Sequence, residues 1–366
     1  MLKGGLYRVR TAGDIRDGLQ EVIVDEDVSE RVLCYTYVTG RASEGDLVLV
    51  NHTGSHLGLG TGGYGFVYAI IRDGKLVEAK LASSDTMCLR YTPFQLNIGS
   101  YEEDEGNRVL TEGFKDLNAL PVVICELHSM LVSTIGGFIS SCVADGKRTD
   151  EFNVVYIMTD QGALPAYFSD TVGMLRNVGM LDHVITCGNA FGGDLNAVNV
   201  YSALVAAKMV FSADVVVIAM GPGITGTGTK FGFSGADQGY IIDAVNRMNG
   251  RPIFVPRLSR NDARSRHRYV SHHSVTVLAD LCCTSVTCVV PSDAESDFMD
   301  HVVSILDPIC TKRGHKMSFV PGTPGTDLAE EMGFELSTMR RSFKEEREFF
   351  LAASAGGALA YEFTKA

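Results

Sequence analysis

The sequence has no tryptophan, no Cys-x-x-Cys pair and no excess of basic residues. Its 44 acidic and 32 basic residues give a formal charge of −12 at pH 7. Nonspecific nucleic-acid binding needs a net basic face, and docking on an anionic membrane needs the same. The lack of tryptophan further disfavours stacking on nucleic-acid bases. We therefore expect neither a nucleic acid nor a membrane among the partners.

Long apolar segments are also missing. The two most apolar stretches, 120–143 and 197–220, are interrupted by ionisable residues such as Glu126 and Lys208, so neither is expected to span a bilayer. The first residues contain no apolar core of signal-peptide length. Nine cysteines, several within apolar runs, favour reduced and buried thiols. These features together favour a cytoplasmic protein.

The chain does have enough length and apolar content for a folded core. At about 150 residues per domain, 366 residues predict two domains. Hydrophobic residues make up 45% and charged residues 21%, as in ordinary globular proteins. Glycine occurs 39 times, which exceeds the usual share of about 7%. The glycines are clustered, and their clusters guide the search for a site.

Residues 1–115 have the pattern of a small β-barrel or sandwich. Short runs rich in Val, Ile, Leu and Tyr follow one another at about ten-residue spacing, without helical periodicity. Turn signals such as Asp73-Gly74 separate them. The glycine-rich run 54–65 is expected to form a tight turn or an interdomain contact. The expected strands are 6–10, 21–24, 32–38, 46–50, 66–71, 76–81 and 89–98.

From Pro121 onward, apolar strands alternate with helical stretches. Strands that are apolar throughout are buried on both faces, which indicates a doubly wound, mostly parallel α/β (Rossmann-like) domain over 116–366, with a C-terminal helix. The polar, acidic stretch 100–118 is the expected linker. The expected strands are 122–125, 154–158, 184–187, 215–220, 253–258, 286–290 and 316–320. The expected helices lie near 129–143, 165–180, 195–212, 235–248, 296–312 and 337–356.

Polar residues and glycines follow most of these strands. In an open parallel sheet, ligands bind beyond the carboxyl ends of the strands. His128 follows the first expected strand and Asp160 follows the second; Gly192, Gly193 and Asp194 follow the third. We expect these residues to gather at one edge of the sheet, where the two carboxylates could do acid–base work.

The fourth strand leads into the loop 221–229, Gly-Pro-Gly-Ile-Thr-Gly-Thr-Gly-Thr. Glycine lets backbone N–H groups approach a ligand, and threonine adds hydroxyl donors, so the loop could hold phosphate or carboxylate. It matches neither the P-loop nor the dinucleotide fingerprint. The alternative is a tight connection between strand and helix. The candidate ligand-binding residues are Gly221, Gly223, Thr225, Gly226, Thr227, Gly228 and Thr229.

The segment 257–274 concentrates positive charge, with five arginines in twelve positions. Arginine binds phosphate and carboxylate through two parallel hydrogen bonds. We expect Arg264, Arg266 and Arg268 to neutralise the charge of a ligand. The alternative is a solvated loop that pairs with surface acids.

The same segment holds three of the nine histidines. Adjacent residues on an extended segment point in opposite directions, so His272 and His273 are not expected to bind one metal together. One of them could join His128, Asp160 or Asp194 in a mixed nitrogen and oxygen site. A divalent metal is therefore left open as a cofactor, and its identity is unknown.

Two functions remain open. The first is an enzyme acting on a small anionic metabolite, with His272 or His273 as general acid or base, Asp194 or Asp160 as a second carboxylate and His128 as a further candidate. Fold analogy favours hydrolysis or group transfer. The second is a non-catalytic protein that senses a metabolite or binds a partner, because no nucleophile signature is present. The sequence leaves a homo-oligomer open.

Five strings carry a family resemblance: LGLGTGGYGFV (57–67), MTDQGALP (158–165), AFGGDLNAV (190–198), GPGITGTGTKFGFSG (221–235) and RHRYVSHHS (266–274). They resemble the bacterial family called domain of unknown function 3866, and segments 337–339 and 349–353 fit its C-terminal end. The resemblance covers nearly the whole chain. It implies no catalytic residues, because the family is uncharacterised.

A weaker resemblance rests on YTPF (91–94) and the later Phe191-Gly192 pair. These are similar to the proprotein-derived subunit of glycine and betaine reductases, which also has a β-rich part before its α/β parts. Maturation of that subunit needs a cysteine directly after an asparagine. This chain has no Asn-Cys pair, so the resemblance implies distant shared architecture and no pyruvoyl group.

Overall fold

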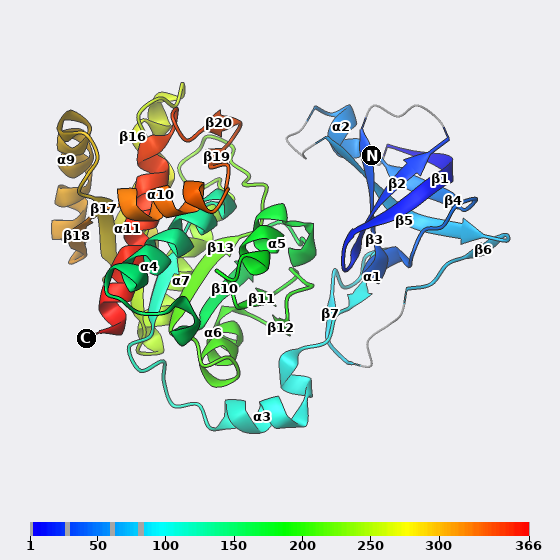
Figure 1. Ribbon diagram of the computed structural model, residues 1–366, viewed down its shortest axis with the longest axis horizontal. Helices are drawn as coiled ribbons and strands as arrows, with labels where there is room; N and C mark the ends of the chain where they lie inside the picture. Colours follow the sequence, from blue (N-terminus) through cyan, green and yellow to red (C-terminus); the bar gives the residue numbers. More distant parts are fainter. Residues whose placement is uncertain (1–2, 26–29, 59–62, 80–83, 366) are drawn as a thin grey trace. The chain divides into compact units, whose positions relative to one another are not determined.

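The computed structural model describes residues 3–25, 30–58, 63–79 and 84–365 (Figure 1). The chain divides into two compact units, Met1–Gly99 and Ser100–Ala366. In the described ranges, no helix is long and apolar enough to cross a membrane. Each of the nine cysteines is a free thiol, and all but Cys283 are buried.

The first unit is a closed five-stranded barrel. Strand β3 pairs with β2 in antiparallel fashion and with β5 in parallel fashion, which closes the order β3-β2-β1-β4-β5. Its core is rich in valine, as expected for β-branched side chains on alternating inward positions. The strands of the barrel are β1 (Gly4–Arg16), β2 (Leu19–Val24), β3 (Arg31–Tyr35), β4 (Leu47–Asn51) and β5 (Tyr64–Arg72). Shorter elements are α1 (Thr36–Thr39), α2 (Thr53–His56), β6 (Lys75–Leu76), β7 (Met87–Cys88) and β8 (Leu96–Asn97).

The barrel confirms the expected fold of this unit but not every expected strand. The strand expected at 89–98 forms only near its end, as β8, because Leu89 and Tyr91 have φ of 50° and 62°, which no strand accommodates. In the glycine-rich run 54–65, the first residues belong to helix α2, and residues 59–62 lie outside the described part. The strand expected at 76–81 begins as β6, and its residues 80–81 also lie outside that part.

The second unit is built on an eight-stranded sheet in which every neighbouring pair is parallel. The strand order is β12-β11-β10-β13-β9-β14-β17-β18. This confirms the expected doubly wound α/β domain. The strands are β9 (Pro121–Ile124), β10 (Val154–Thr159), β11 (His183–Cys187), β12 (Leu195–Ala197), β13 (Val215–Met220), β14 (Arg251–Phe254), β17 (Thr287–Pro291) and β18 (Lys316–Val320).

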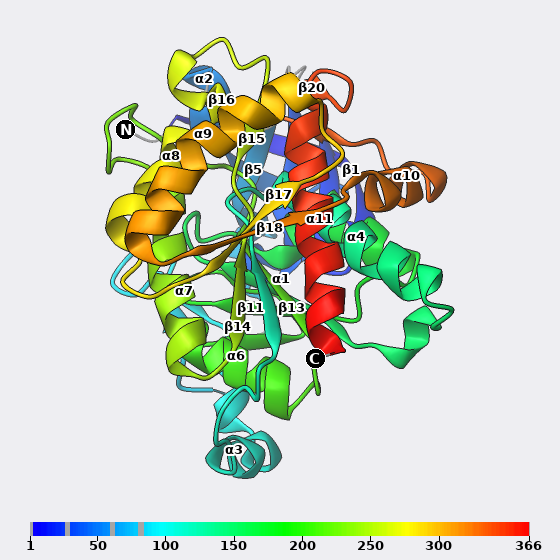
Figure 2. The same cartoon turned by 90° about the vertical axis from the view of Figure 1, so that its left-hand side faces the viewer.

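Helices cover both faces of this sheet (Figure 2). Helices α4, α10 and α11 pack together on one face, and α6, α7 and α9 lie on the other. A Cβ on Gly137 would lie 1.9 Å from the Ser354 carbonyl oxygen, so α4 and α11 approach too closely for any other residue. The helices are α3 (Glu105–Glu112), α4 (Leu131–Ala144), α5 (Asp170–Asn177), α6 (Val200–Met209), α7 (Asp237–Arg247), α8 (His272–Thr276), α9 (Ser296–Arg313), α10 (Thr323–Glu331) and α11 (Arg347–Thr364).

Some boundaries differ from the expected ones. The helix expected at 195–212 begins only at Val200, because Asn199 caps it by accepting from the Ser202 N–H (3.1 Å). The helix expected at 337–356 begins at Arg347 and is preceded by the small hairpin β19 (Ser337–Thr338) and β20 (Arg341–Ser342).

The acidic stretch expected as a linker carries structure of its own. It contains helix α3, and the Tyr101 hydroxyl donates to the Ser202 carbonyl in α6 (3.1 Å). In the sequence, the first compact unit ends at Gly99 and the second begins at Ser100.

Candidate functional site

At the carboxyl edge of the sheet, neighbouring strands continue to opposite faces between β10 and β13, between β13 and β9 and between β9 and β14. Strand β9 continues into α4 and its neighbour β14 into α8, on opposite faces. In the same way β10 continues into α5 and its neighbour β13 into α7. Neighbouring strands whose connections diverge leave room for a ligand at their carboxyl ends. The loops that follow these four strands are therefore where a site is expected.

Glu126, Arg257 and His273 form a buried cluster of ionisable side chains beyond the carboxyl ends of β9 and β14. One Glu126 oxygen, Oε1, contacts His273 Nδ1 and lies 3.7 Å from Arg257 Nη1. The three side chains are 0%, 2% and 5% exposed. Arg257 Nη2 also lies 3.8 Å from a carboxylate oxygen of Asp262. Charges this deeply buried are costly unless they are paired, so each depends on the others.

Short elements fold the arginine- and histidine-rich segment 257–274 and bring His273 to the Glu126 carboxylate. Strands β15 (Leu258–Ser259) and β16 (Tyr269–Val270) pair in antiparallel fashion and close the segment into a loop. Ser271 then caps α8, since its hydroxyl accepts from the His273 N–H (3.2 Å). The His273 ring stacks on Phe233, with 4.0 Å between ring centroids.

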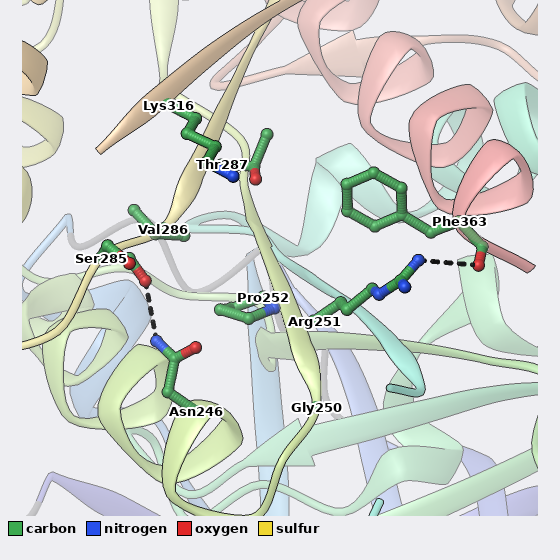
Figure 3. A pocket seen from close by; sticks show the side chains of 9 residues that line it. All are labelled: Asn246, Gly250, Arg251, Pro252, Ser285, Val286, Thr287, Lys316 and Phe363. Carbon is green, nitrogen blue, oxygen red and sulfur yellow. Dashed lines mark hydrogen bonds between the residues drawn. The ribbon is translucent and has the colours of Figure 1, made fainter. Parts of the chain in front are cut away.

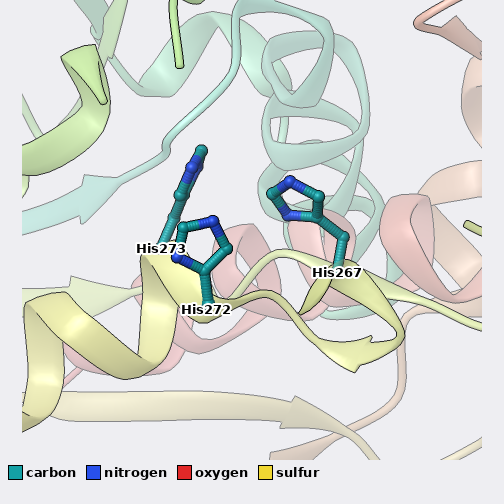
Figure 4. Close-up of side chains that lie close together, drawn as sticks. All are labelled: His267, His272 and His273. Atoms are coloured by element: carbon teal, nitrogen blue, oxygen red, sulfur yellow. The ribbon is translucent and has the colours of Figure 1, made fainter. Parts of the chain in front are cut away.

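His267, His272 and His273 come together (Figure 4). One nitrogen of each ring lies within 4.8 Å of the others. The sequence-based expectation that the two adjacent histidines diverge is wrong, because it assumed an extended chain. The segment is helical from His272 onward, and successive helical residues turn by only about 100°. Both rings therefore face the same space.

The imidazoles of His267 and His272 are neutral at physiological pH. Burial, together with the nearby Arg257 and Arg264, lowers the pKa of His267 to about 3. Burial also lowers the pKa of His272, and the neighbouring His273 adds to the effect. A neutral imidazole has one ring nitrogen with a free lone pair, which can accept a proton or bind a metal.

The glycine-rich loop folds back on itself. The Thr227 N–H donates to the Gly232 carbonyl (2.8 Å), and the Ser234 N–H donates to the Thr225 carbonyl (2.9 Å). The hydroxyls of Thr227 and Thr229 lie 3.0 Å apart, within hydrogen-bond distance. Two of the predicted hydroxyl donors thus already have a partner within the loop.

Glycine is required at two places in this loop, and Arg266 lies beside one of them. Gly223 and Gly228 have φ of 106° and 81°, which favour glycine. A Cβ on Gly228 would lie 3.5 Å from the guanidinium carbon of Arg266. The structure thus brings one predicted arginine to the predicted loop. Gly221 is buried at the end of β13, while Gly226 is exposed.

The three predicted arginines differ in their partners. Arg264 forms a bidentate pair with Asp262, at 2.9 and 2.8 Å. Arg266 and Arg268 are exposed and make no ion pair with any residue that the structure describes. Of these three arginines, only Arg266 and Arg268 therefore have a guanidinium group available to an added anion.

His128 and Asp160 lie at the predicted edge with their polar atoms engaged. The His128 ring nitrogens lie 3.1 Å from the Tyr156 hydroxyl and 2.7 Å from the Ser169 hydroxyl. Burial lowers the pKa of His128 to about 4, as in a satisfied core histidine. Asp160 accepts from the backbone and side chain of Asn189, at 2.9 and 3.0 Å.

Asp194, Gly192 and Gly193 lie elsewhere than expected or have structural roles. Asp194 accepts from the Val184 N–H (2.8 Å) at the amino end of β11, opposite to the expected edge, and from Arg176 (2.7 Å). It therefore does not pair with Asp160. A Cβ on Gly193 would lie 2.7 Å from the Val184 carbonyl oxygen, and one on Gly192 would clash with a neighbouring ring.

A family comparison can now be set beside this geometry. The sequence model of a family described as "Protein of unknown function (DUF3866)" matches residues 31–357. The chain belongs to the DUF3866 family. No curated protein matches the chain.

This DUF3866 protein carries a further carboxylate that the sequence analysis missed. Asp237 begins α7 and accepts from the Thr159 hydroxyl and the Gln161 amide, at 3.3 Å each, at the carboxyl end of β10. Burial raises the pKa of Asp237 to about 6. Glu126 was missed as a partner of His273, although an ionisable residue at the end of an apolar strand was a signal for it.

The DUF3866 chain also has a pocket of about 380 Å³ at the opposite, amino-terminal edge of the sheet (Figure 3). Arg251 donates there to the Phe363 carbonyl (3.3 Å), and Asn246 donates to the Ser285 carbonyl (2.8 Å). Lys316 is exposed at its rim. The residues lining this pocket include none of the predicted site residues.

Proposed function

We propose that this protein binds a small metabolite carrying phosphate or carboxylate at the carboxyl edge of its α/β sheet. The observation that carries the proposal is the position of Arg266. Its exposed guanidinium lies beside Gly228 of the glycine-rich loop and has no ion pair among the described residues. An arginine fork next to a loop of glycines suits an anion that approaches the backbone closely.

The buried group beneath this position could serve a reaction. The Glu126 carboxylate holds Nδ1 of His273, which leaves the other ring nitrogen to take or give a proton. In that case hydrolysis or group transfer is the reaction class that fold analogy favours.

Binding without conversion is the second candidate, and one observation favours it. Ser234 is the serine nearest in sequence to the loop. Its hydroxyl oxygen lies 3.0 Å from the Thr225 backbone nitrogen and 3.4 Å from the Thr225 carbonyl oxygen. A hydroxyl held in this way is a poor nucleophile. The protein would then sense the metabolite or pass the signal to a partner. In either case the buried free thiols suit the reducing cytoplasm.

Isothermal titration with pyrophosphate and citrate, in the presence of a chelator and at fixed ionic strength, tests anion binding. We expect saturable binding of at least one probe, weakened about tenfold to a hundredfold in Arg266→Gln. Arg247→Gln removes another exposed arginine of the same unit and should leave the affinity unchanged. Equal affinity of wild type and Arg266→Gln, or no saturable binding of either probe, would contradict the proposal.

A further inference from the structure

The three-histidine cluster has a feature that anion binding does not explain. His272 Nε2 is buried and has no hydrogen-bond partner among the described residues, and the same holds for Glu126 Oε2 beside it. Leaving a buried polar atom without a partner costs about 1–3 kcal/mol. Native structures contain few such atoms, and each calls for an explanation.

The surrounding contacts orient the other two rings. Nδ1 of His273 contacts the Glu126 carboxylate, and Nδ1 of His267 lies 2.7 Å from the Ser271 hydroxyl. If both Nδ1 atoms donate their hydrogen, the Nε2 atom of each ring keeps its lone pair. Metal-binding histidines have this arrangement, with the second ring nitrogen held by a carboxylate or another oxygen.

We propose that His267, His272 and His273 form a binding site for a divalent transition-metal ion, with zinc as the representative ion. Imidazole nitrogens are good ligands for zinc, copper, iron and nickel, and poor ones for magnesium or calcium. The site goes beyond anion binding and does not depend on it.

The dimensions of the cluster suit such an ion after a small contraction. Zinc–nitrogen bonds of about 2.0–2.1 Å place tetrahedral ligands about 3.4 Å apart. One nitrogen of each ring already lies within 4.8 Å of one nitrogen of each of the other two rings. Three protein ligands leave the fourth position of a tetrahedral ion open, which is the pattern of catalytic rather than structural zinc sites.

The charges around the cluster decide how strongly it binds. The positive charge of Arg257 disfavours the binding of a metal cation, whereas the negative charge of the buried Glu126 carboxylate favours it. The two lie 3.7 Å apart and largely offset each other.

The test is a titration of the full chain, first stripped of metal with a chelator, with Zn²⁺ in competition with a chromophoric chelator. We expect one tightly bound Zn²⁺ per chain, and visible absorption bands of tetrahedral Co²⁺ when cobalt replaces zinc. His267→Ala and His272→Ala should each weaken Zn²⁺ binding at least about a hundredfold, which exceeds the usual effect of losing an outer-shell contact.

Two controls separate the metal site from misfolding and from anion binding. His56→Ala removes an exposed histidine of the barrel unit and should not change the zinc affinity. Arg266→Gln removes a positive charge that acts on His272, so it should not weaken zinc binding although it weakens anion binding. His272 is only partly buried, so His272→Ala should keep the metal-free melting temperature. Failure of the wild-type chain to bind one Zn²⁺ would overturn the proposal, as would unchanged binding in a folded His272→Ala variant.

Discussion

The two edges of the α/β sheet place charge in opposite ways. At the carboxyl edge Glu126, Arg257 and Asp262 are almost wholly buried and depend on one another. At the amino edge the positive charges of Arg251 and Lys316 border a pocket and stay partly or fully exposed. Solvent can hydrate the second pair at little cost, whereas the first group keeps its charges only through its neighbours. A pocket alone therefore does not mark the site; buried and incompletely partnered charge is the better guide.

The difference follows from the lengths of the connections. The loop after β13 extends to α7 at Asp237, and the segment after β14 extends to α8 at His272. These long connections can fold over charged side chains. At the amino edge, only Met248, Asn249 and Gly250 join the end of α7 to β14, so little chain is available to cover Arg251.

The largest expected effect is on stability at the carboxyl edge. Glu126→Ala removes the partner of both Arg257 and His273 and leaves a buried guanidinium poorly compensated, so the free energy of unfolding should fall by about 3–5 kcal/mol. Arg251→Ala at the amino edge should cost about 1 kcal/mol or less. Urea denaturation followed by the helical circular dichroism signal compares them. Equal losses of unfolding free energy in Glu126→Ala and Arg251→Ala would contradict the proposed difference between the two edges.

The next effect depends on pH. Burial raises the pKa of Asp237 from 3.8 to about 6, so the native state holds this proton more tightly than the unfolded state. Wild-type stability should therefore fall as pH rises through this interval, by about 3 kcal/mol, and the loss should level off above it. Asp237→Asn should lack this decline. Urea midpoints of both proteins across the interval measure it, and parallel curves would contradict the assignment.

A smaller effect separates two arginines of one loop. Arg264→Ala removes a bidentate partner of the buried Asp262, which keeps Arg341 at 3.2 Å, so we expect a loss of about 1 kcal/mol in stability and little change in pyrophosphate affinity. Arg266→Ala should do the reverse, with stability changed by less than about 0.5 kcal/mol. Thermal melts and pyrophosphate titrations of both variants distinguish the two roles. If both variants lost stability or affinity to the same extent, the assignment of different roles to Arg264 and Arg266 would be refuted.

The smallest effect is expected at the amino-edge pocket. Lys316 is exposed and lacks an ion pair within the described residues, so Lys316→Ala should change the free energy of unfolding by less than about 0.5 kcal/mol. Zinc and pyrophosphate affinities should equal those of the wild type. A marked loss of either ligand would move the functional site to the opposite edge of the sheet.

Much of the fold could be predicted from the sequence. Strands buried on both faces are apolar throughout, so the seven expected strands of the α/β unit each correspond to an observed one. Strand β12 was missed because Leu195–Ala197 is short and half-buried. Helix α8 was missed because its histidines and serines carry no apolar periodicity, and that error concealed the approach of His272 to His273.

The site could be predicted by residue type and edge but not by partner. Glu126 and His273 are 147 positions apart, and no local pattern links them. Asp194 was placed at the wrong end of the sheet, because sequence does not show that the loop after β11 returns to the amino end of that strand before β12 begins. Which of Arg264 and Arg266 remains available depends on Asp262, whose burial is a property of the tertiary structure.

The close contact of α4 with α11 bears on how this family can evolve. A Cβ on Gly357 would lie 1.8 Å from the Thr134 carbonyl oxygen, and Gly137 is confined in the same way by Ser354. Selection for folding alone should hold both positions as glycine in every relative that keeps this helical layer. An alignment of relatives should therefore show two invariant regions in one chain. Invariance of glycine between the helices would reflect steric necessity, whereas invariance of the three histidines would record selection for chemistry.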